Sequence, residues 1–281
     1  MREIDVKIVK EAVKRLFLKA NFYLDNKVKD KIKESLKKER SQLAKDILKT
    51  ILKNAELAKN KMKPICQDTG SALVFMEIGQ DIHFTNGFVK DAVNDGMREA
   101  YFEGYLRKSI VQDPVFERKN TMDNSPAIIY EKIVPGDKLK IIVAPKGGGA
   151  ENMGEVRMLK PADGLEGVKQ FILERIKKSS GNPCPPIIVG VGIGGNFDYS
   201  AYLSKIALLR PIDEFNENPK WAKFEKEMLI EINKLDVGPQ GLGGKTTALK
   251  VAVETYPCHI ASLPVAINLQ CHAHRHAEEI I

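Results

Sequence analysis

The stretch from Pro186 to Gly195 is PIIVGVGIGG, and it is the segment that best indicates the fold. It is apolar, short enough for a single strand, and is followed over residues 199–209 by helical spacing of apolar side chains. A strand without polar alternation is typical of the buried interior of a sheet. A buried strand that leads directly into a helix predicts a domain in which helices cover a sheet.

Segments on both sides of this stretch extend the same pattern. Apolar runs bounded by glycine and proline predict strands, and apolar residues at helical spacing predict helices. The predicted strands are SALVFMEIG (71–79), AIIY (127–130), KLKIIVAP (138–145), TALKVAVE (247–254) and LPVAINL (263–269), with a turn at 134–137. The predicted helices are residues 88–108, 164–178, 199–209 and 219–234.

The N-terminal fifth is expected to be helical and basic, because residues 4–21 and 28–58 have helical apolar spacing. Residues 1–60 hold 17 Lys and Arg against 9 Asp and Glu, whereas the remaining 221 residues hold 27 against 28. Lysine alternates with glutamate there and aromatic residues are almost absent, which is typical of a solvated helix face and not of a nucleic-acid site. We expect one catalytic domain over 1–281, of α/β or α+β class, with a helical part (1–60) and a mixed-sheet part (61–281).

The overall composition is that of a globular protein. The chain has 281 residues, 43% hydrophobic and 29% charged, with a formal charge of +7. No apolar run approaches the roughly 20 residues that span a bilayer, and the N-terminus has no uninterrupted apolar core. We therefore expect a cytoplasmic protein without a membrane span.

Three glycine-rich segments lie at ends of predicted strands, which suits a site for a small anion built from backbone amides. The run 190–195 satisfies the dinucleotide pattern G-x-G-x-x-G, but no second strand with an acidic end follows, which favours a tight strand-to-helix turn over a nicotinamide or flavin site. The run 241–246, GLGGKT, lacks the glycine spacing of a phosphate-binding Walker loop. The run 145–152, PKGGGAEN, can direct consecutive backbone N–H groups at a small anion.

The four cysteines leave three interpretations open. Cys66 precedes a polar Gln-Asp-Thr, Cys184 lies in a proline-rich turn, and Cys271 begins a histidine-rich segment, CHAHRH. Cys258, beside His259, could join Cys271 and the C-terminal histidines in a zinc site, or three of the cysteines could bind an iron–sulfur cluster. Buried thiols with surface histidines are the third possibility.

The cysteine motifs also carry a resemblance to a known family. In order from about residue 60 to residue 276, the motifs PICQDTG, YLRKS, PKGGGAEN, GNPCPP, GVGIGG, GPQGLGGKTTALKV and NLQCHAHR resemble the alpha subunit of class I, iron–sulfur fumarate hydratase. They resemble its relative L(+)-tartrate dehydratase equally. The resemblance implies a [4Fe-4S] cluster at strand ends, bound by Cys66, Cys184 and Cys271, with Cys258 as a non-ligand. One iron without a protein ligand could then act as a Lewis acid.

The resemblance also implies roles for other residues. Asp68 corresponds to the group that moves a proton at the substrate hydroxyl, and His259 to one that orients it or the substrate. Gln67, Arg107 and the backbone of Gly148 match positions that hold the substrate carboxylates, a task that suits a guanidinium and backbone amides. The implied activity is reversible hydration of fumarate to L-malate.

The sequence does not account for the whole reaction. Single-chain members of the family continue into a second domain, so the resemblance implies a separate beta subunit, in a heterodimer or an α2β2 assembly, acting on a dicarboxylate. The alternatives are the alpha subunit of L(+)-tartrate dehydratase and, more distantly, a non-catalytic zinc or redox-sensing module.

Overall fold

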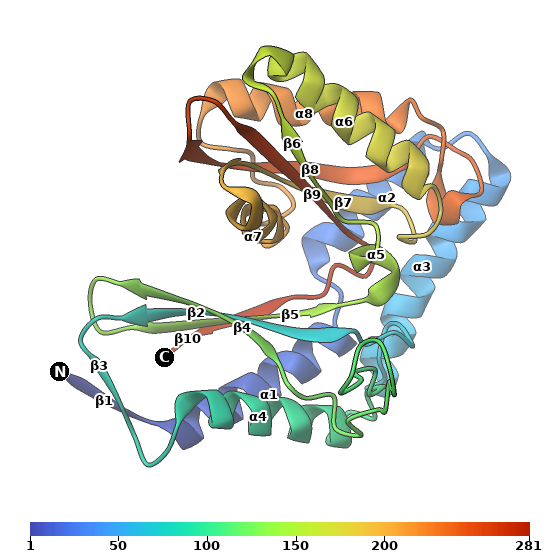
Figure 1. Cartoon of the computed structure of the whole chain (residues 1–281). Coiled ribbons are helices and arrows are strands. Elements are labelled where there is room, and N and C mark those ends of the chain that lie inside the picture. Colours follow the sequence, from blue (N-terminus) through green and yellow to red (C-terminus); the bar gives the residue numbers. More distant parts are fainter. The chain divides into compact units, whose positions relative to one another are not determined.

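The computed structural model describes all residues, 1–281, and contacts between residues divide them into two units (Figure 1). Unit 1 comprises Met1–Leu24, Asn54–Gly148 and Arg275–Ile281, and unit 2 comprises Asp25–Lys53 and Gly149–His274. Helix α3 (Gln42–Lys61) has residues in both units, and the short α5 (Gly148–Glu151) begins at their boundary. Each unit is thus assembled from segments that are far apart in the sequence.

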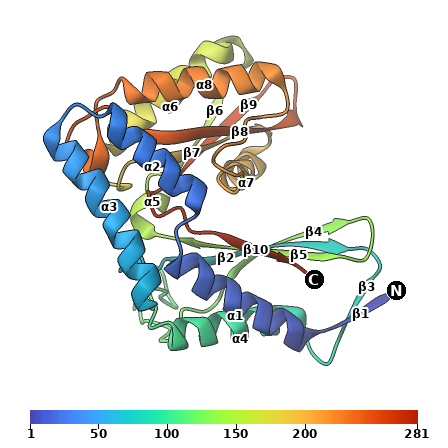
Figure 2. The same cartoon turned by 180° about the vertical axis from the view of Figure 1, so that it is seen from behind.

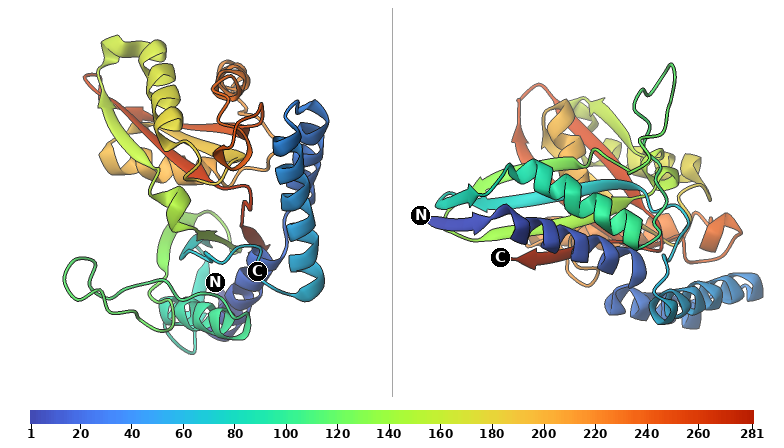
Figure 3. Two further views of the ribbon diagram at one scale, coloured as in Figure 1. Left: turned by 90° about the vertical axis from the view of Figure 1, so that its right-hand side faces the viewer. Right: turned by 90° about the horizontal axis from the view of Figure 1, so that it is seen from below.

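Unit 1 contains a mixed sheet with two helices on one face. The sheet has the order β10-β5-β2-β4, in which β2 is parallel to β4 and antiparallel to β5, and β10 is antiparallel to β5. Figure 2 and the right panel of Figure 3 show the two helices side by side along the sheet. The elements are β1 (Arg2–Asp5), α1 (Val6–Phe22), β2 (Ser71–Gly79), β3 (Ile82–Thr85), α4 (Val89–Glu103), β4 (Ile128–Val134), β5 (Leu139–Lys146) and β10 (Ala277–Ile280).

The core of unit 1 explains this arrangement. Every third or fourth residue of α1 is apolar and fully buried, among them Val9, Val13 and Phe17. These side chains pack against α4 and against alternate residues of β2 and β5, such as Val74 and Ile141. Apolar residues that recur with the helical period of 3.6 and the strand period of 2 therefore pack into one core.

Unit 2 contains a second mixed sheet, of order β6-β9-β7-β8, in which only β7 and β8 run parallel. Figure 1 shows α6 and α8 on one face of this sheet and α7 on the other. Its elements are α2 (Asn26–Lys38), β6 (Glu155–Leu159), α6 (Gly164–Ser179), β7 (Ile187–Gly195), α7 (Phe197–Ala207), α8 (Pro219–Asn233), β8 (Ala248–Cys258) and β9 (Leu263–Gln270), with 3₁₀ turns at Pro161–Asp163 and Pro239–Gly241.

The mixed α/β class predicted from the sequence is confirmed, and each strand and helix predicted after residue 60 corresponds to an element. The helical pattern over 28–58 is two helices, because the chain turns at Glu39 between α2 and α3. The prediction missed the four-residue strands β1, β3 and β10 and the five-residue strand β6, which are too short to establish a period. None of the helices combines the length and apolar character needed to span a bilayer.

Candidate functional site

The segment from Ile65 to Gly70 carries the first predicted ligand and the predicted acid, and unit 1 holds it by many hydrogen bonds. The buried hydroxyl of Tyr101 lies 2.9 Å from the carbonyl oxygen of Thr69 and 3.0 Å from that of Gly70. The amide of Asn124, also buried, donates to the carbonyl of Gly70 at 3.2 Å. Burial raises the pKa of Tyr101, so its hydroxyl remains a donor at neutral pH.

The Asp68 carboxylate is fixed by two backbone amides. Its Oδ1 accepts a hydrogen bond from the N–H of Gly70 at 3.1 Å, and its Oδ2 accepts one from the N–H of Gly148 at 2.8 Å. A Cβ at Gly147 would lie 3.0 Å from Oδ2, so the glycine leaves room for the carboxylate. The PKGGG loop therefore directs one backbone amide, that of Gly148, at a carboxylate of the chain itself.

The other predicted residues of unit 1 lie close to this segment in the sequence or by contact. Cys66 is half-buried, and its Sγ lies 3.5 Å from Oε1 of the exposed Gln67. Arg107 has an exposed side chain, and its carbonyl accepts a hydrogen bond from Oγ1 of Thr69 at 2.9 Å. Gln67, Asp68 and Arg107 therefore belong to one part of unit 1.

In unit 2, Cys184 lies in the turn before β7 and Cys271 directly follows β9. Because β7 and β9 are antiparallel neighbours, both cysteines lie at the same end of these strands. The backbone N–H of His272, next to Cys271, donates to the carbonyl of Cys184 at 3.4 Å, and Nδ1 of His272 lies 3.0 Å from the same oxygen. Cys184 adopts φ +56°, and its N–H is bonded to the carbonyl of Gly181. Two of the three predicted cluster ligands thus lie on neighbouring segments.

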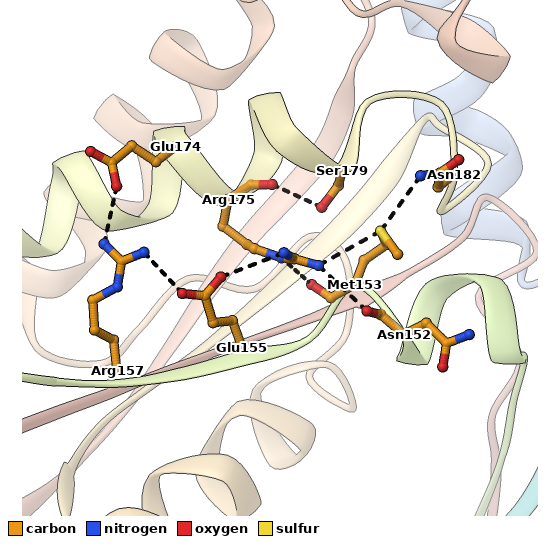
Figure 4. A network of polar contacts seen from close by, with 8 residues as sticks. All are labelled: Asn152, Met153, Glu155, Arg157, Glu174, Arg175, Ser179 and Asn182. Carbon is orange, nitrogen blue, oxygen red and sulfur yellow. Dashed lines mark hydrogen bonds and ion pairs between the residues drawn. The ribbon is translucent and has the colours of Figure 1, made fainter.

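The turn before Cys184 is supported by a polar network on α6 (Figure 4). Arg175 donates from Nε to the carbonyl of Met153 at 2.7 Å and from Nη2 to that of Asn152 at 3.4 Å. The sulfur of Met153 in turn lies 3.9 Å from the amide nitrogen of Asn182, two residues before Cys184. The network joins the segment after α5 to the cysteine turn.

The structure does not bring His259 together with Cys184 and Cys271. Strand β7 pairs at Ile188 with Gln270 and at Gly195 with Cys258. Cys258 and His259 therefore lie near the opposite end of β7 from Cys184 and Cys271. Seven residues of strand correspond to about 23 Å. The zinc site built on Cys258 and Cys271 is therefore not supported within one chain.

His259 instead lines a shallow pocket of about 530 Å³ at the carboxyl ends of β7 and β8. Tyr199, Tyr256 and Cys258 line the same pocket. The His259 side chain is exposed, and its Nδ1 accepts a hydrogen bond from the N–H of Ala261 at 3.1 Å. The Nδ1 contact holds the imidazole to its own loop.

The two other glycine-rich segments have structural roles in unit 2. The segment 190–195 lies within β7, and the predicted tight strand-to-helix turn is formed at its end, where Gly194 and Gly195 have positive φ and only Asn196 separates β7 from α7. The segment around 241–246 binds a carboxylate of the chain: Glu39 accepts hydrogen bonds from the backbone N–H groups of Lys245 (3.1 Å) and Thr246 (3.2 Å). Burial raises the pKa of Glu39, but these hydrogen bonds outweigh it and the pKa lies below its ordinary value.

Comparison with known families decides what this set of residues belongs to. The sequence model described as Fumarate hydratase (Fumerase) matches residues 10–279. The chain belongs to the fumarate hydratase family. The match covers both units and every candidate residue described above.

Individual members of the family are also similar to the chain. It is 43% identical over 273 residues, 96% of both chains, to a protein of Methanocaldococcus jannaschii named putative L(+)-tartrate dehydratase subunit alpha. It is 34% identical over 250 residues to proteins of Escherichia coli O157:H7 and strain K12 named L(+)-tartrate dehydratase subunit alpha, covering 88% of this chain and 82% of theirs. Both names place their proteins as alpha subunits.

The sequence alone did not predict the roles of the buried polar residues that hold the Asp68 segment, namely Asn21, Tyr101, Asn124 and Arg275. A signal was available for Asn21, because it continues the apolar face of α1 one turn after the buried Phe17. Arg275 stood within a motif of the family but received no role, since a cationic residue near a strand end is usually assigned to the surface.

Proposed function

We propose that this chain is the alpha subunit of an iron–sulfur hydro-lyase that reversibly hydrates fumarate to L-malate. The observation that supports it best is the Asp68 carboxylate, fixed by the N–H groups of Gly70 and Gly148 two residues after a half-buried cysteine. A carboxylate held in one orientation can give and take a proton at a defined oxygen of the substrate.

Three thiols are proposed to hold the [4Fe-4S] cluster: Cys66 of unit 1 with Cys184 and Cys271 of unit 2. The donors fit, because thiolates are the usual ligands of such clusters and two of the three lie on hydrogen-bonded neighbouring segments. When bound, an iron without a protein ligand supplies a Lewis acid for the substrate hydroxyl.

The remaining residues of unit 1 are proposed to bind and orient the substrate. The exposed amide of Gln67 and the guanidinium of Arg107 offer donors for its two carboxylates, and Asp68 moves the proton at the hydroxyl oxygen. Gly148 belongs to this proposal through its N–H, which in the present structure orients Asp68. Charge on the dicarboxylate beyond what these groups balance requires further cationic groups, which we assign to a beta subunit.

His259 is proposed to orient Asp68 or the substrate, but not in the site of its own chain. About 23 Å along β7 separates it from the end of the strand where Cys184 and Cys271 lie. We therefore propose that a second copy of the chain supplies it, as an α2β2 assembly would allow.

L(+)-tartrate dehydratase remains the second candidate, and the printed names of the M. jannaschii and E. coli relatives favour it. The chemistry is the same loss or gain of water, on a substrate with one more hydroxyl. A panel of fumarate, L-malate and L(+)-tartrate, assayed anaerobically with the beta subunit, distinguishes the two by which substrate turns over.

The cysteine and Asp68 variants test the proposal itself. We expect Cys66→Ser, Cys184→Ser and Cys271→Ser to lose bound iron and sulfide, and Cys258→Ser to retain both. Asp68→Asn should keep the cluster and lose roughly 100-fold or more in turnover, because an amide cannot exchange the proton. Retention of iron in all four serine variants, or normal turnover of Asp68→Asn, would refute the assignment.

A further inference from the structure

Arg275 is a buried cation that contacts the candidate site from below the surface of unit 1. Its side chain is 2% exposed, and its Nη1 donates to the carbonyl oxygen of Asp68 at 2.6 Å and to Oδ1 of Asn21 at 3.3 Å. A Cβ at Gly147 would lie 3.3 Å from Nη2 of Arg275 and 3.0 Å from Oδ2 of Asp68. The guanidinium therefore reaches the backbone of Asp68, and Gly147 lies beside both groups.

Asn21 ties the same segment at its other end. It is fully buried in the last turn of α1, where its Nδ2 donates to the carbonyl of Phe17 at 2.9 Å. The backbone carbonyl oxygen of Asn21 accepts a hydrogen bond from the N–H of Ile65 at 2.9 Å, one residue before Cys66. The backbone of Asn21 thus holds Ile65, and its side chain contacts Arg275, which holds Asp68, with Cys66 and Gln67 between the two ends.

Fold stability does not account for this arrangement. The Nε of Arg275 is buried and has no hydrogen-bond partner. Burying a charged group with an unsatisfied donor weakens a fold unless its other contacts compensate, and an apolar side chain of the same volume would avoid that cost. The guanidinium instead donates to the backbone carbonyl of Asp68 and to the side chain of Asn21.

We propose that Asn21 and Arg275 form a clamp that positions Cys66 and the carboxylate of Asp68, with Arg275 as a positioning residue for the hydration reaction. The catalytic half of this inference rests on the proposed function of Asp68. The clamp fixes the ends of a four-residue segment, so that one side chain can serve as a cluster ligand and another can meet the substrate. Arg275 itself does not touch the substrate.

The first test needs no activity. Amide hydrogen exchange of the chain is followed at Ile65 and Gly148 in the wild type, Arg275→Met, Arg275→Lys and Asn21→Ala. We expect exchange about tenfold faster in Arg275→Met, because local opening of the segment is no longer opposed, with Arg275→Lys in between. If Arg275→Met does not fold, Arg275→Lys and Asn21→Ala carry the test. Arg275→Lys should show faster exchange at both amides, and Asn21→Ala, which keeps the backbone acceptor of Ile65, should show it at Gly148.

The matched control is Arg210→Met in unit 2. Arg210 is mostly buried and donates to a backbone carbonyl, that of Val253, and to Glu225, without contacting the clamp. This variant should lower the melting temperature while leaving exchange at Ile65 and Gly148 unchanged. Equal acceleration in Arg210→Met would mean that the exchange reports general destabilisation, and it would overturn the clamp.

The second test uses the cluster-loaded chain with its beta subunit. Displacing a reacting group by about 1 Å costs up to roughly 100-fold in rate, so Arg275→Met should lower kcat with KM within about twofold, and Arg275→Lys should recover part of the loss. If exchange is faster in the variants but the wild type has no hydratase activity, the clamp stands and the proposed function is refuted. Unchanged exchange and kcat in an active enzyme would refute the clamp alone.

Discussion

Lys250 is a buried cation whose state depends on its immediate contacts. Its side chain, on β8, is 3% exposed, and its Nζ donates to the carbonyl oxygens of Arg210 at 3.1 Å and Pro211 at 2.6 Å. Burial, and secondarily the charge of Arg210, lowers the pKa of Lys250 from 10.5 to about 8. A neutral amine still has two N–H donors, so both hydrogen bonds persist after deprotonation.

The free energy of unfolding should therefore rise with pH between about 8 and 10.5. In this window the unfolded state holds the Lys250 proton and the folded state does not, which stabilises the folded state as pH increases, by up to about 3 kcal/mol. Below pH 8 both states are protonated and the cost of the buried charge is fully present. Urea unfolding of wild type and Lys250→Met at pH 7.5, 9 and 10 measures the effect. The unfolding free energy of the wild type minus that of Lys250→Met should rise with pH, and a difference that does not change with pH would contradict the prediction.

At this scale the sequence predicts candidate groups better than their partners. Cys66 could be selected because polar residues follow it directly before a buried strand, and Asp68 through the resemblance of its motif to a known family. The partner of the Gly148 amide could not, since Asp68 lies 80 residues away and no local pattern specifies such a contact. Periodicity indicates that Asn21 is buried but not that it meets Arg275.

Strand β7 and helix α7 show why glycine recurs in the stretch that best indicates the fold. Val189 and Val191 lie in the core formed with α6 and α8, whereas Gly190 and Gly192 alternate with them and face α7. A Cβ at Gly190 would lie 2.2 Å from the carbonyl oxygen of Ser204. The glycines therefore allow the helix backbone to approach the strand directly, and no nucleotide is needed to explain them.

Substitution of Gly192 should push α7 away from β7. In Gly192→Ala the new Cβ would lie 2.1 Å from the carbonyl oxygen of Ser200, so α7 must move, and we expect a loss of about 2–3 kcal/mol in unfolding free energy. Gly154→Ala is the control, because its Cβ would meet no atom closer than 3.2 Å. Thermal and urea unfolding compare the two variants; equal stability would mean that the close approach is not required.

Elements of this kind are predictable as strand or helix but not in their packing. The apolar character of 186–195 indicated a buried strand correctly, whereas the spacing of its glycines, which fits the dinucleotide pattern, did not show which element packs against them. The period-2 alternation of glycine with valine identifies one flat face, but only the position of α7 shows what covers it. The order β6-β9-β7-β8 likewise depends on partners that are not adjacent in sequence.

The division of the whole molecule follows contacts that the sequence does not display. Elements in chain order suggested a helical part and a mixed-sheet part, whereas each unit combines an N-terminal segment with later ones. A single sequence gives no signal for a C-terminal strand of four residues that returns to an N-terminal unit. The family membership was predictable, because its motifs are local and occur in order.

The isolated chain should be inactive even with its cluster intact. The groups proposed here account for the hydroxyl side of the substrate and part of its charge, and no residue of this chain is assigned as the base at carbon. Mixing with the beta subunit should restore fumarate or tartrate turnover in an anaerobic assay, with iron content measured first. Full turnover by the chain alone would show that the whole site lies within residues 1–281.

The pairing of β10 with β5 also has a consequence for biosynthesis. Residues 149–274, which lie between them in the sequence, belong to unit 2, so the ribosome makes this long insert before it makes the strand that closes the unit 1 sheet. At about 5–20 residues per second this takes roughly 6–25 s, during which β5 is paired with β2 on one side but lacks β10 on the other. An open strand edge can pair with other chains, so the nascent protein passes through an aggregation-prone interval that ends when Arg275 and β10 emerge from the ribosome.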